Sequence, residues 1–132
     1  MQLDVNFRLQ IYTTEKNQTE AELDCRREPN RHLVIFDEEW KINAVESTLM
    51  LCTGYHLKDY WIDGTRQNIL TDWKFTDGRN IPMAQTTFWH MDNPDSPNKN
   101  KSCLRLKYRG TVDRYRLDDR KCDVLNPYIC EY

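Results

Sequence analysis

The stretch Tyr60-Trp61-Ile62-Asp63-Gly64 separates two parts of the chain that have different sequence patterns. It is a run of aromatic and apolar residues ending in an Asp-Gly pair, which is typical of a buried strand entering a turn. The sequence before it carries two helix patterns, whereas the sequence after it consists of strand and loop patterns. We therefore predict a buried strand at 60–64 and a C-terminal half without helices.

The N-terminal part begins with an alternating pattern. Residues 7–12 alternate apolar and polar side chains, as a half-buried strand at the start of a sheet does. Thr19-Glu20-Ala21-Glu22 matches a capping box, which predicts a helix that carries Cys25 and ends before Pro29. A short strand-like run follows at 32–36.

A second helix is predicted after Asp37-Glu38-Glu39. These acids place negative charge at the positive end of a helix that reaches about Leu51. The predicted apolar face of this helix consists of Trp40, Ala44, Val45 and Leu49.

The C-terminal half contains a hairpin pattern and a long loop. Trp73-Lys74-Phe75-Thr76-Asp77-Gly78 is predicted to form a strand closed by an Asp-Gly turn. The segment from Gly78 to Cys103 is rich in proline and asparagine and is too long for a plain connection, so we expect it to carry function. Three closing strands are predicted at 103–108, 112–117 and 128–132.

Length and charge limit the possible classes of protein. A chain of 132 residues is sufficient for one domain, spanning 1–132, and too short for two. The 19 Lys and Arg residues and 21 Asp and Glu residues give a net charge of −2, so we expect no nucleic-acid partner. No apolar run approaches the roughly 20 residues that span a bilayer, and no signal-like segment is present near the N-terminus. We therefore expect a soluble chain in its mature form, with no membrane partner.

The five cysteines, Cys25, Cys52, Cys103, Cys122 and Cys130, show no Cys-x-x-Cys spacing. This pattern argues against a zinc or redox centre and favours disulfides. Four cysteines allow three pairings, and the spacing does not choose among them. The odd number leaves one thiol unpaired. Such a framework predicts a secreted, extracellular protein.

The order of these elements resembles the C-type lectin-like domain from about residue 7 to residue 132. The residues that carry the resemblance are Ala21-Glu22 before Cys25, His32-Leu33-Val34, Tyr60-Trp61-Ile62-Asp63-Gly64, Trp73 with Phe75-Thr76-Asp77-Gly78, Trp89 with Pro94, Cys103, Asp119 before Cys122, and Tyr128-Ile129-Cys130-Glu131. The resemblance implies an α+β fold in which two helices flank two small antiparallel sheets, with a long ligand-binding loop. Within the family, the chain most resembles small secreted invertebrate lectins that consist of this domain alone.

The resemblance also implies how the cysteines pair. It predicts the disulfides Cys25–Cys130 and Cys103–Cys122 and leaves Cys52 unpaired near the end of the second helix. An exposed odd cysteine in a secreted domain tends to find a partner, so Cys52 is a candidate for an intersubunit disulfide. The resulting homodimer would raise a weak single-site affinity through avidity.

Sugar-binding members of the family hold calcium at a characteristic set of positions. These are a Glu-Pro-Asn or Gln-Pro-Asp tripeptide, an acid two residues before the next cysteine, and an Asn-Asp pair. The corresponding residues of this chain are Asn93-Pro94-Asp95, Lys101 and Asp118-Asp119. Calcium takes about six to eight oxygen ligands, several of them anionic, and an ammonium group repels it. Lys101 therefore disfavours calcium, and we expect no cofactor.

We expect Lys101 to take the place of the cation by pairing with the surrounding carboxylates. The predicted sugar-binding residues are Asn93, Asp95, Lys101, Asp118 and Asp119. Galactose-binding members of the family usually stack the sugar on an aromatic residue that follows the tripeptide. The segment 96–100 of this chain has no aromatic residue, which favours mannose-like hexoses. A structural interpretation stays open, in which Lys101 points to solvent and the proline only shapes the turn.

These patterns predict a calcium-independent lectin for terminal hexoses in the recognition of microbial or self glycans, as in innate immunity. The alternative is a lectin-like domain that engages protein or mineral surfaces. We expect no enzyme activity, because Cys52 and His56 are near each other only in sequence. Asn17 and Asn100 begin N-glycosylation patterns, and a glycan on Asn100 would crowd the predicted site.

Overall fold

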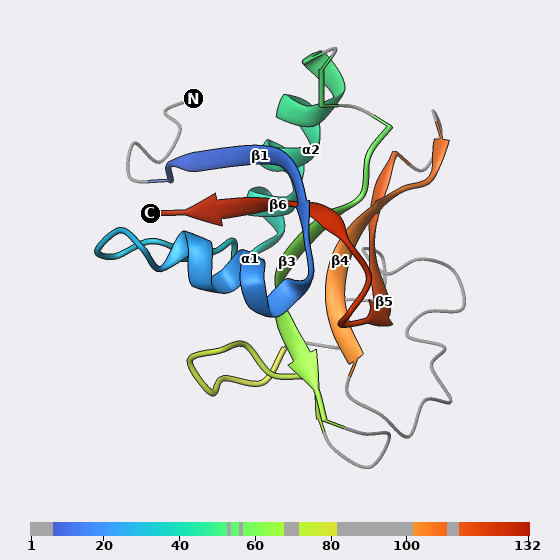
Figure 1. The fold of residues 1–132 in the computed structure, drawn as a ribbon. Helices are drawn as coiled ribbons and strands as arrows, with labels where there is room; N and C mark the ends of the chain where they lie inside the picture. The colour runs from blue at the N-terminus through green and yellow to red at the C-terminus, as the bar shows by residue number, and fades with distance from the viewer. Residues whose placement is uncertain (1–6, 53, 56, 68–71, 82–101, 111–113) are drawn as a thin grey trace.

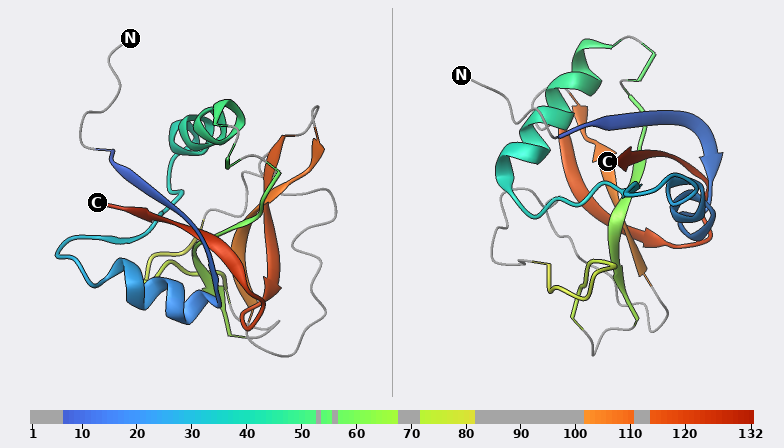
Figure 2. Two further views of the ribbon diagram at one scale, coloured as in Figure 1. Left: turned by 45° about the horizontal axis from the view of Figure 1, so that its top comes forward. Right: turned by 90° about the vertical axis from the view of Figure 1, so that its left-hand side faces the viewer.

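The computed structural model describes residues 7–52, 54–55, 57–67, 72–81, 102–110 and 114–132 (Figure 1). The elements in chain order are β1 (Leu9–Lys16), α1 (Gln18–Cys25), β2 (His32–Leu33), α2 (Glu39–Leu51), β3 (Tyr60–Arg66), β4 (Ser102–Tyr108), β5 (Tyr115–Lys121) and β6 (Asn126–Glu131). The two helices lie on either side of the paired strands β1 and β6 (Figure 2). The expected α+β class is confirmed. In the described part of the chain, neither helix is long and apolar enough to cross a membrane.

The strands form one mixed sheet in the order β1-β6-β3-β4-β5, with β2 also pairing with β6. Two antiparallel groups can be distinguished within it, β1 and β2 with β6, and β3 with β4 and β5. A single parallel residue pair, Trp61 with Tyr128, joins the two groups. The two small sheets expected from the sequence are therefore continuous through this pair.

Helix α1 begins two residues before the predicted start. Asn17 is its N-cap: the Asn17 side-chain oxygen accepts from the Glu20 backbone N–H at 2.8 Å. A tertiary contact explains the earlier start, because the buried Gln18 amide donates to the backbone oxygens of Ile62 (3.1 Å) and Gly64 (3.0 Å). The capping box at Thr19 was thus wrong as the start, although the helix itself and its Cys25 are as predicted.

Helix α2 has the predicted bounds, but its buried face is different. The buried residues are Ile42, Val45, Glu46 and Leu49. Trp40, predicted to be in the core, is 37% exposed and packs edge-on against Phe7 at the surface. The Lys41 ammonium lies over both of these rings, which gives them a surface partner in place of the core.

Both predicted disulfides are present. Cys25–Cys130 joins α1 to β6, and Cys103–Cys122 joins β4 to the chain after β5. The four cysteines pack with the buried Trp61 in a small hydrophobic cluster that includes Ala21 of α1. Cys52 is a free thiol at the end of α2, as predicted, but it is half-buried and not exposed.

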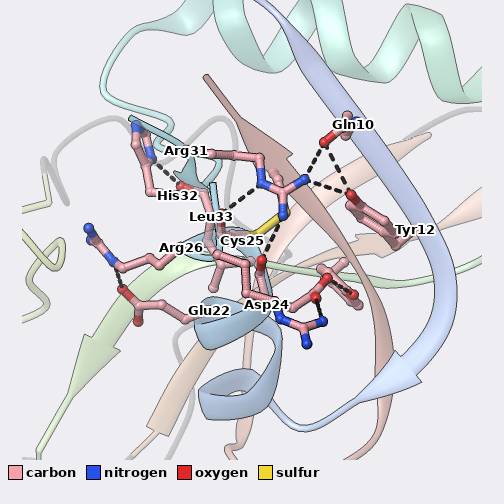
Figure 3. The surroundings of a disulfide bond; sticks show 12 residues. Gln10, Tyr12, Glu22, Asp24, Cys25, Arg26, Arg31, His32 and Leu33 are labelled. Carbon is pink, nitrogen blue, oxygen red and sulfur yellow. Dashed lines mark hydrogen bonds and ion pairs between the residues drawn. A yellow bond between two sulfur atoms is a disulfide. The ribbon is translucent and has the colours of Figure 1, made fainter. Parts of the chain in front are cut away.

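The surroundings of the first disulfide are fixed by Arg31, which is buried (Figure 3). Its guanidinium donates to the backbone oxygens of Cys25 (2.7 Å) and Asp24 (2.6 Å) and to the Tyr12 hydroxyl (2.7 Å). The hydrogen bond from the Tyr128 hydroxyl lowers the pKa of Asp24. The Arg31 guanidinium therefore connects the end of α1 to β1.

The close packing of β3 against β4 depends on Gly64. Its φ is +145°, and a Cβ there would lie 2.9 Å from the Leu104 side chain and 2.9 Å from that of Ile81. Any other residue would be both strained and overpacked at this position. Glycine therefore sets the separation of the two strands next to the long loop.

The predicted turn at Asp77-Gly78 is present, with the Gly78 N–H donating to the Phe75 oxygen at 3.0 Å. Its flanks make isolated bridges, Thr65 with Lys74 and Lys74 with Asn80, rather than a full strand. The buried Asp63 accepts from the Thr76 backbone N–H (2.9 Å) and from its hydroxyl. This carboxylate therefore fastens the turn to β3.

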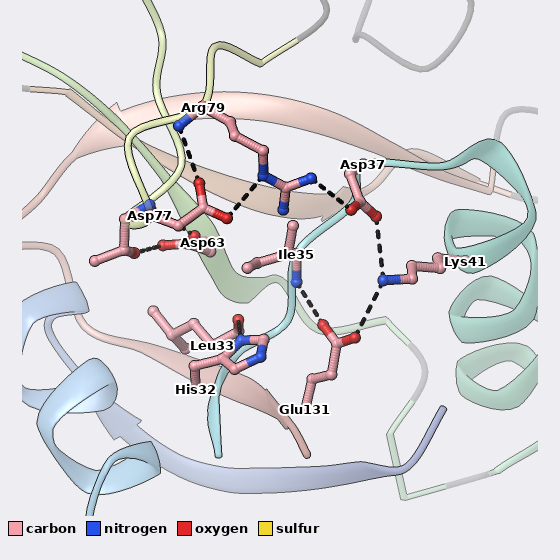
Figure 4. Close-up of polar contacts among 10 residues, drawn as sticks. His32, Leu33, Ile35, Asp37, Lys41, Asp63, Asp77, Arg79 and Glu131 are labelled. Atoms are coloured by element: carbon pink, nitrogen blue, oxygen red, sulfur yellow. Dashed lines mark hydrogen bonds and ion pairs between the residues drawn. The ribbon is translucent and has the colours of Figure 1, made fainter. Parts of the chain in front are cut away.

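A chain of charged side chains ties the same turn to α2 and β6 (Figure 4). Arg79 pairs with Asp37 at 3.0 Å, Asp37 pairs with Lys41 at 3.1 Å, and Lys41 pairs with the buried Glu131 at 3.2 Å. Burial opposes the ionised form of Asp37, but the hydrogen bonds from Arg79 and Lys41 outweigh it and lower its pKa. The Glu131 carboxylate also accepts from the Ile35 N–H at 2.9 Å, so these ion pairs order the segment that enters α2.

The Asp63 contact generates a prediction for pH. Burial raises the pKa of Asp63 above 3.8, although the Thr76 hydrogen bonds oppose it. A raised pKa in the folded state stabilises the fold below about pH 3.8, and this contribution is lost as the pH rises through the folded-state value. The difference in unfolding free energy between the wild type and Asp63→Asn should therefore favour the wild type more at pH 3.5 than at pH 7, as measured by urea denaturation.

Asp63→Ala removes both acceptors and should cost about 1 to 3 kcal/mol at pH 3.5. This cost should shrink toward pH 7 as it does for Asp63→Asn, because alanine does not ionise either. A wild-type advantage over Asp63→Asn that grows toward neutral pH would contradict the assignment.

Candidate functional site

The structure describes two of the five predicted sugar-binding residues. Asn93, Asp95 and Lys101 lie outside the described residues, whereas Asp118 and Asp119 are in β5. The long loop segment leads directly into β4 at Ser102. The described part of the candidate site is therefore the β4–β5 ladder.

The register of this ladder determines where the two acids point. Arg105 pairs with Asp118 across the strands, and Leu104 pairs with Asp119. Neighbouring residues of a strand face opposite sides of the sheet. Asp118 and Asp119 therefore lie on opposite faces of β5 and do not form one cluster of carboxylates.

Asp118 takes part in a buried ion pair. The Arg105 Nε lies 2.8 Å from the Asp118 carboxylate, and the two side chains are only 8% and 10% exposed. The Arg105 guanidinium also reaches Asp59 at 3.4 Å. Asp59 in turn accepts from the Tyr108 backbone N–H at 2.9 Å. A fixed cation of the protein thus already compensates the charge of Asp118.

Asp119 is on the core side of the sheet with Leu104 and Leu117. It is 8% exposed, and Ser102 at the start of β4 is 1% exposed. Both acids are predicted sugar-binding residues, and both are buried in the β4–β5 ladder. Their contact with a sugar stays a prediction.

The sequence analysis did not identify Arg105. The signal was present, because Cys103-Leu104-Arg105-Leu106-Lys107 alternates apolar residues with cations. The pairing with Asp118 depends on the strand register, however, and a shift by one residue would have placed Arg105 on the other face. Its partner was therefore not accessible to pattern analysis.

The described donor set does not fit calcium. The ion takes about six to eight oxygen ligands on one site, whereas the two acids of β5 face opposite sides and one is paired with Arg105. At the next family position the sequence has Lys101 in place of an acid.

The fold and the two disulfides are those of a lectin domain, and comparison with known families gives the same result. The model of the lectin C-type domain matches residues 14–132. The chain belongs to the C-type lectin domain family. No curated protein matches the sequence.

Similar solved structures share the fold at low sequence identity. The C-type lectin TC14 from the tunicate Polyandrocarpa misakiensis has a TM-score of 0.75 at 19% identity, covering 96% of this chain and 97% of its own. The murine dendritic cell inhibitory receptor 2 domain, in complex with N-glycan, has a TM-score of 0.76 at 17% identity, covering 99% and 98%. A calcium-independent type II antifreeze protein has a TM-score of 0.69 at 19% identity, covering 99% and 89%.

The Arg105–Asp118 pair leads to a prediction for stability. Arg105→Gln should lower the free energy of unfolding by about 3 kcal/mol, because it leaves a buried carboxylate without its charge partner. The double variant Arg105→Gln with Asp118→Asn should recover more than half of this loss, as measured by urea denaturation.

Lys107→Gln is the control on the same face, since Lys107 is 31% exposed and lies 4.0 Å from Asp59. Its effect should stay within about 0.5 kcal/mol. Strictly additive single effects would show that Arg105 and Asp118 are not coupled.

Proposed function

We propose that this protein is a carbohydrate-binding lectin that recognises terminal hexoses without calcium and catalyses no reaction. The single observation that carries the calcium-independent part is the buried pair of Arg105 and Asp118. In this proposal Asn93, Asp95 and Lys101 of the loop contact the sugar. Asp118 and Asp119 hold the base of that loop.

Family membership supports the binding of carbohydrate. The matched region spans residues 14–132, which includes the loop and the strands on both sides of it. A structurally similar receptor domain is a complex with N-glycan. Sugar hydroxyls are selected by hydrogen bonds, because a misplaced hydroxyl leaves a buried polar group unpaired at about 1 to 3 kcal/mol.

Two cations support independence from calcium. Arg105 compensates Asp118, and Lys101 replaces the acid that a calcium site would need. A fixed ammonium or guanidinium can order nearby carboxylates and amides as an ion would, but it donates hydrogen bonds and does not coordinate oxygens. The sugar is then bound by direct hydrogen bonds alone.

Mannose-like hexoses are the proposed ligands. The segment 96–100, Ser-Pro-Asn-Lys-Asn, carries no aromatic side chain that could stack on the apolar face of galactose. Amide and carboxylate acceptors suit adjacent hydroxyls on a pyranose ring. Two disulfides further support an extracellular location, where such a protein would meet microbial or self glycans.

A second candidate function is the binding of a protein or mineral surface through the same loop. The specific observation in its favour is the similarity to a calcium-independent type II antifreeze protein. The two functions require different properties of the loop. Sugar binding needs hydrogen-bond acceptors that converge on one sugar ring, whereas binding to an extended surface needs contact groups that are regularly spaced on a flat face.

A glycan array in the presence and absence of EDTA tests the proposed function. We expect binding to terminal mannose or a related hexose that EDTA does not reduce. Asn93→Ala with Asp95→Ala should abolish it, whereas the matched pair Asp72→Ala with Lys74→Ala, outside the loop, should not. Lys101→Glu should make binding calcium-sensitive, because it restores an anionic oxygen donor.

Silence on every sugar would favour the surface-binding alternative. Loss of wild-type binding on adding EDTA would identify a conventional calcium lectin and refute calcium independence.

We also propose that Cys52 links two copies of the chain. The free thiol lies beside Leu51, which is 83% exposed. The linked dimer would present two sites and increase avidity for clustered glycans. Non-reducing electrophoresis should show a dimer that Cys52→Ser converts to a monomer. A wild-type band that runs only as a monomer would refute the link.

A further inference from the structure

Four cations gather at the end of the β4–β5 hairpin: Lys107, Arg109, Arg114 and Arg116, which we name the basic hairpin. The hairpin is closed by the Arg109 N–H donating to the Arg114 oxygen at 2.6 Å. The side chains of Lys107, Arg114 and Arg116 are 31%, 40% and 29% exposed, and Arg109 is exposed. Positive charge is therefore accessible over this end of the sheet.

Lys107 and Arg116 are directly opposite each other in the ladder. Directly opposed side chains have Cβ atoms about 4.5 to 5.5 Å apart, and like charges at this spacing destabilise a sheet. The next pair along the same face, Arg105 with Asp118, is complementary in charge, whereas Lys107 and Arg116 are alike. The like-charged pair is a cost that binding of an anion would offset.

The acids in contact with the basic hairpin are shared and do not match its charge. Glu46 serves both Arg114 (3.3 Å) and Arg116 (3.7 Å). Asp59 lies 4.0 Å from Lys107 but is closer to Arg105, at 3.4 Å. Asp113, in the sequence of the hairpin turn, is one further acid. Among the described residues, these cations pair with two acids, Glu46 and Asp59, one of which is also engaged by Arg105.

Glu46 has an additional structural task. Its carboxylate accepts from the Tyr115 backbone N–H at 3.2 Å, which is a hydrogen bond at the outer edge of strand β5. It is buried at 8% exposure. Part of its capacity as an acceptor is therefore used by the backbone. Arg116 Nη1 also donates to the Tyr115 backbone oxygen at 2.8 Å, and a guanidinium has five N–H donors in all.

We propose that the basic hairpin binds an acidic polysaccharide, with sulfate or carboxylate groups held between Lys107 and Arg116. Arginine forks and a lysine ammonium provide charge-assisted hydrogen bonds to such groups. This proposal uses none of the loop residues of the proposed lectin function and does not depend on that function. The chain thus carries an anionic-glycan surface despite its overall net charge of −2.

The chemistry of this face favours a polysaccharide over a single-stranded nucleic acid. Nucleic-acid channels combine cations with aromatic rings on which bases stack. The two aromatic residues of the hairpin, Tyr108 and Tyr115, pack against each other on the core side, with centroids 5.4 Å apart, and Tyr115 is 0% exposed. The described basic face therefore offers charge and hydrogen-bond donors but no stacking platform.

Binding to immobilised heparin, as the sulfated polysaccharide, tests the proposal at low ionic strength. The wild type should bind heparin but not neutral dextran, and its affinity should fall as salt is added. Lys107→Gln with Arg116→Gln should weaken binding about tenfold, the effect of two lost ionic contacts of roughly 0.7 kcal/mol each. The control Arg26→Gln with Arg27→Gln removes the same charge just after α1, where the side chains are 52% and 79% exposed. It should leave binding within about twofold of the wild type.

Urea denaturation of both double variants verifies folding, and the single variants Lys107→Gln and Arg116→Gln replace the double variant if it is unstable. The proposal is overturned if the wild type does not bind heparin, if the two double variants lose affinity equally, or if single-stranded DNA binds more tightly than heparin. Neutral-glycan binding by the loop should be unchanged in Lys107→Gln with Arg116→Gln, so failure of either function is recognised separately.

Discussion

Trp61 occupies the position on which the rest of the fold depends. It is fully buried in β3 and forms the parallel pair with Tyr128 that joins the two groups of strands. Its indole N–H donates to the backbone oxygens of Lys16 (2.8 Å) and Val124 (3.2 Å), which lie at the end of β1 and just before β6. A large apolar ring with one satisfied polar atom thus fixes three separate chain segments at one point. The disulfides close around this point, since Cys25, Cys103 and Cys130 pack in the same cluster.

The strands next to the candidate site are held by the core and by a disulfide. β3 is held by Trp61 and Gly64 and presents a rigid partner to β4, and the disulfide Cys103–Cys122 ties the start of β4 to the end of β5. The long loop segment enters the sheet at Ser102, one residue before that disulfide. A functional loop mounted on a crosslinked ladder can vary in sequence without disturbing the core. This explains how family positions that hold calcium can carry a lysine while the fold is retained.

The sequence predicted local features better than the contacts between distant segments. The strand beginning at Tyr60 and the Asp77-Gly78 turn were identified because their signals are local. The turn predicted at Asp63-Gly64 was wrong, since β3 continues to Arg66. The disulfide pairing came from the family resemblance and not from spacing. The start of α1 was missed because Gln18 is fixed by backbone oxygens of β3, distant in sequence. Trp40 was assigned to the core because its spacing places it on the apolar face of the helix. Its surface partners, Phe7 and Lys41, cannot be inferred from the spacing of apolar residues. Arg105 was missed for the same reason, because only the register shows that it faces Asp118.

A lectin that replaces a bound ion with side chains would gain and lose in definable ways. Calcium sites depend on the concentration of the ion, so their loops are ordered only when it is present. A guanidinium paired with Asp118 is always in place, which would keep the base of the loop ordered in any medium. The cost is that a side-chain cation cannot accept the hydroxyls of a sugar into its coordination shell, so each site would bind with hydrogen bonds only. Sites of weak affinity gain most avidity when several of them bind the same ligand. A second contact surface for the same glycan, or a linked second copy of the chain, would therefore compensate for the absence of a metal more effectively than a change within the loop.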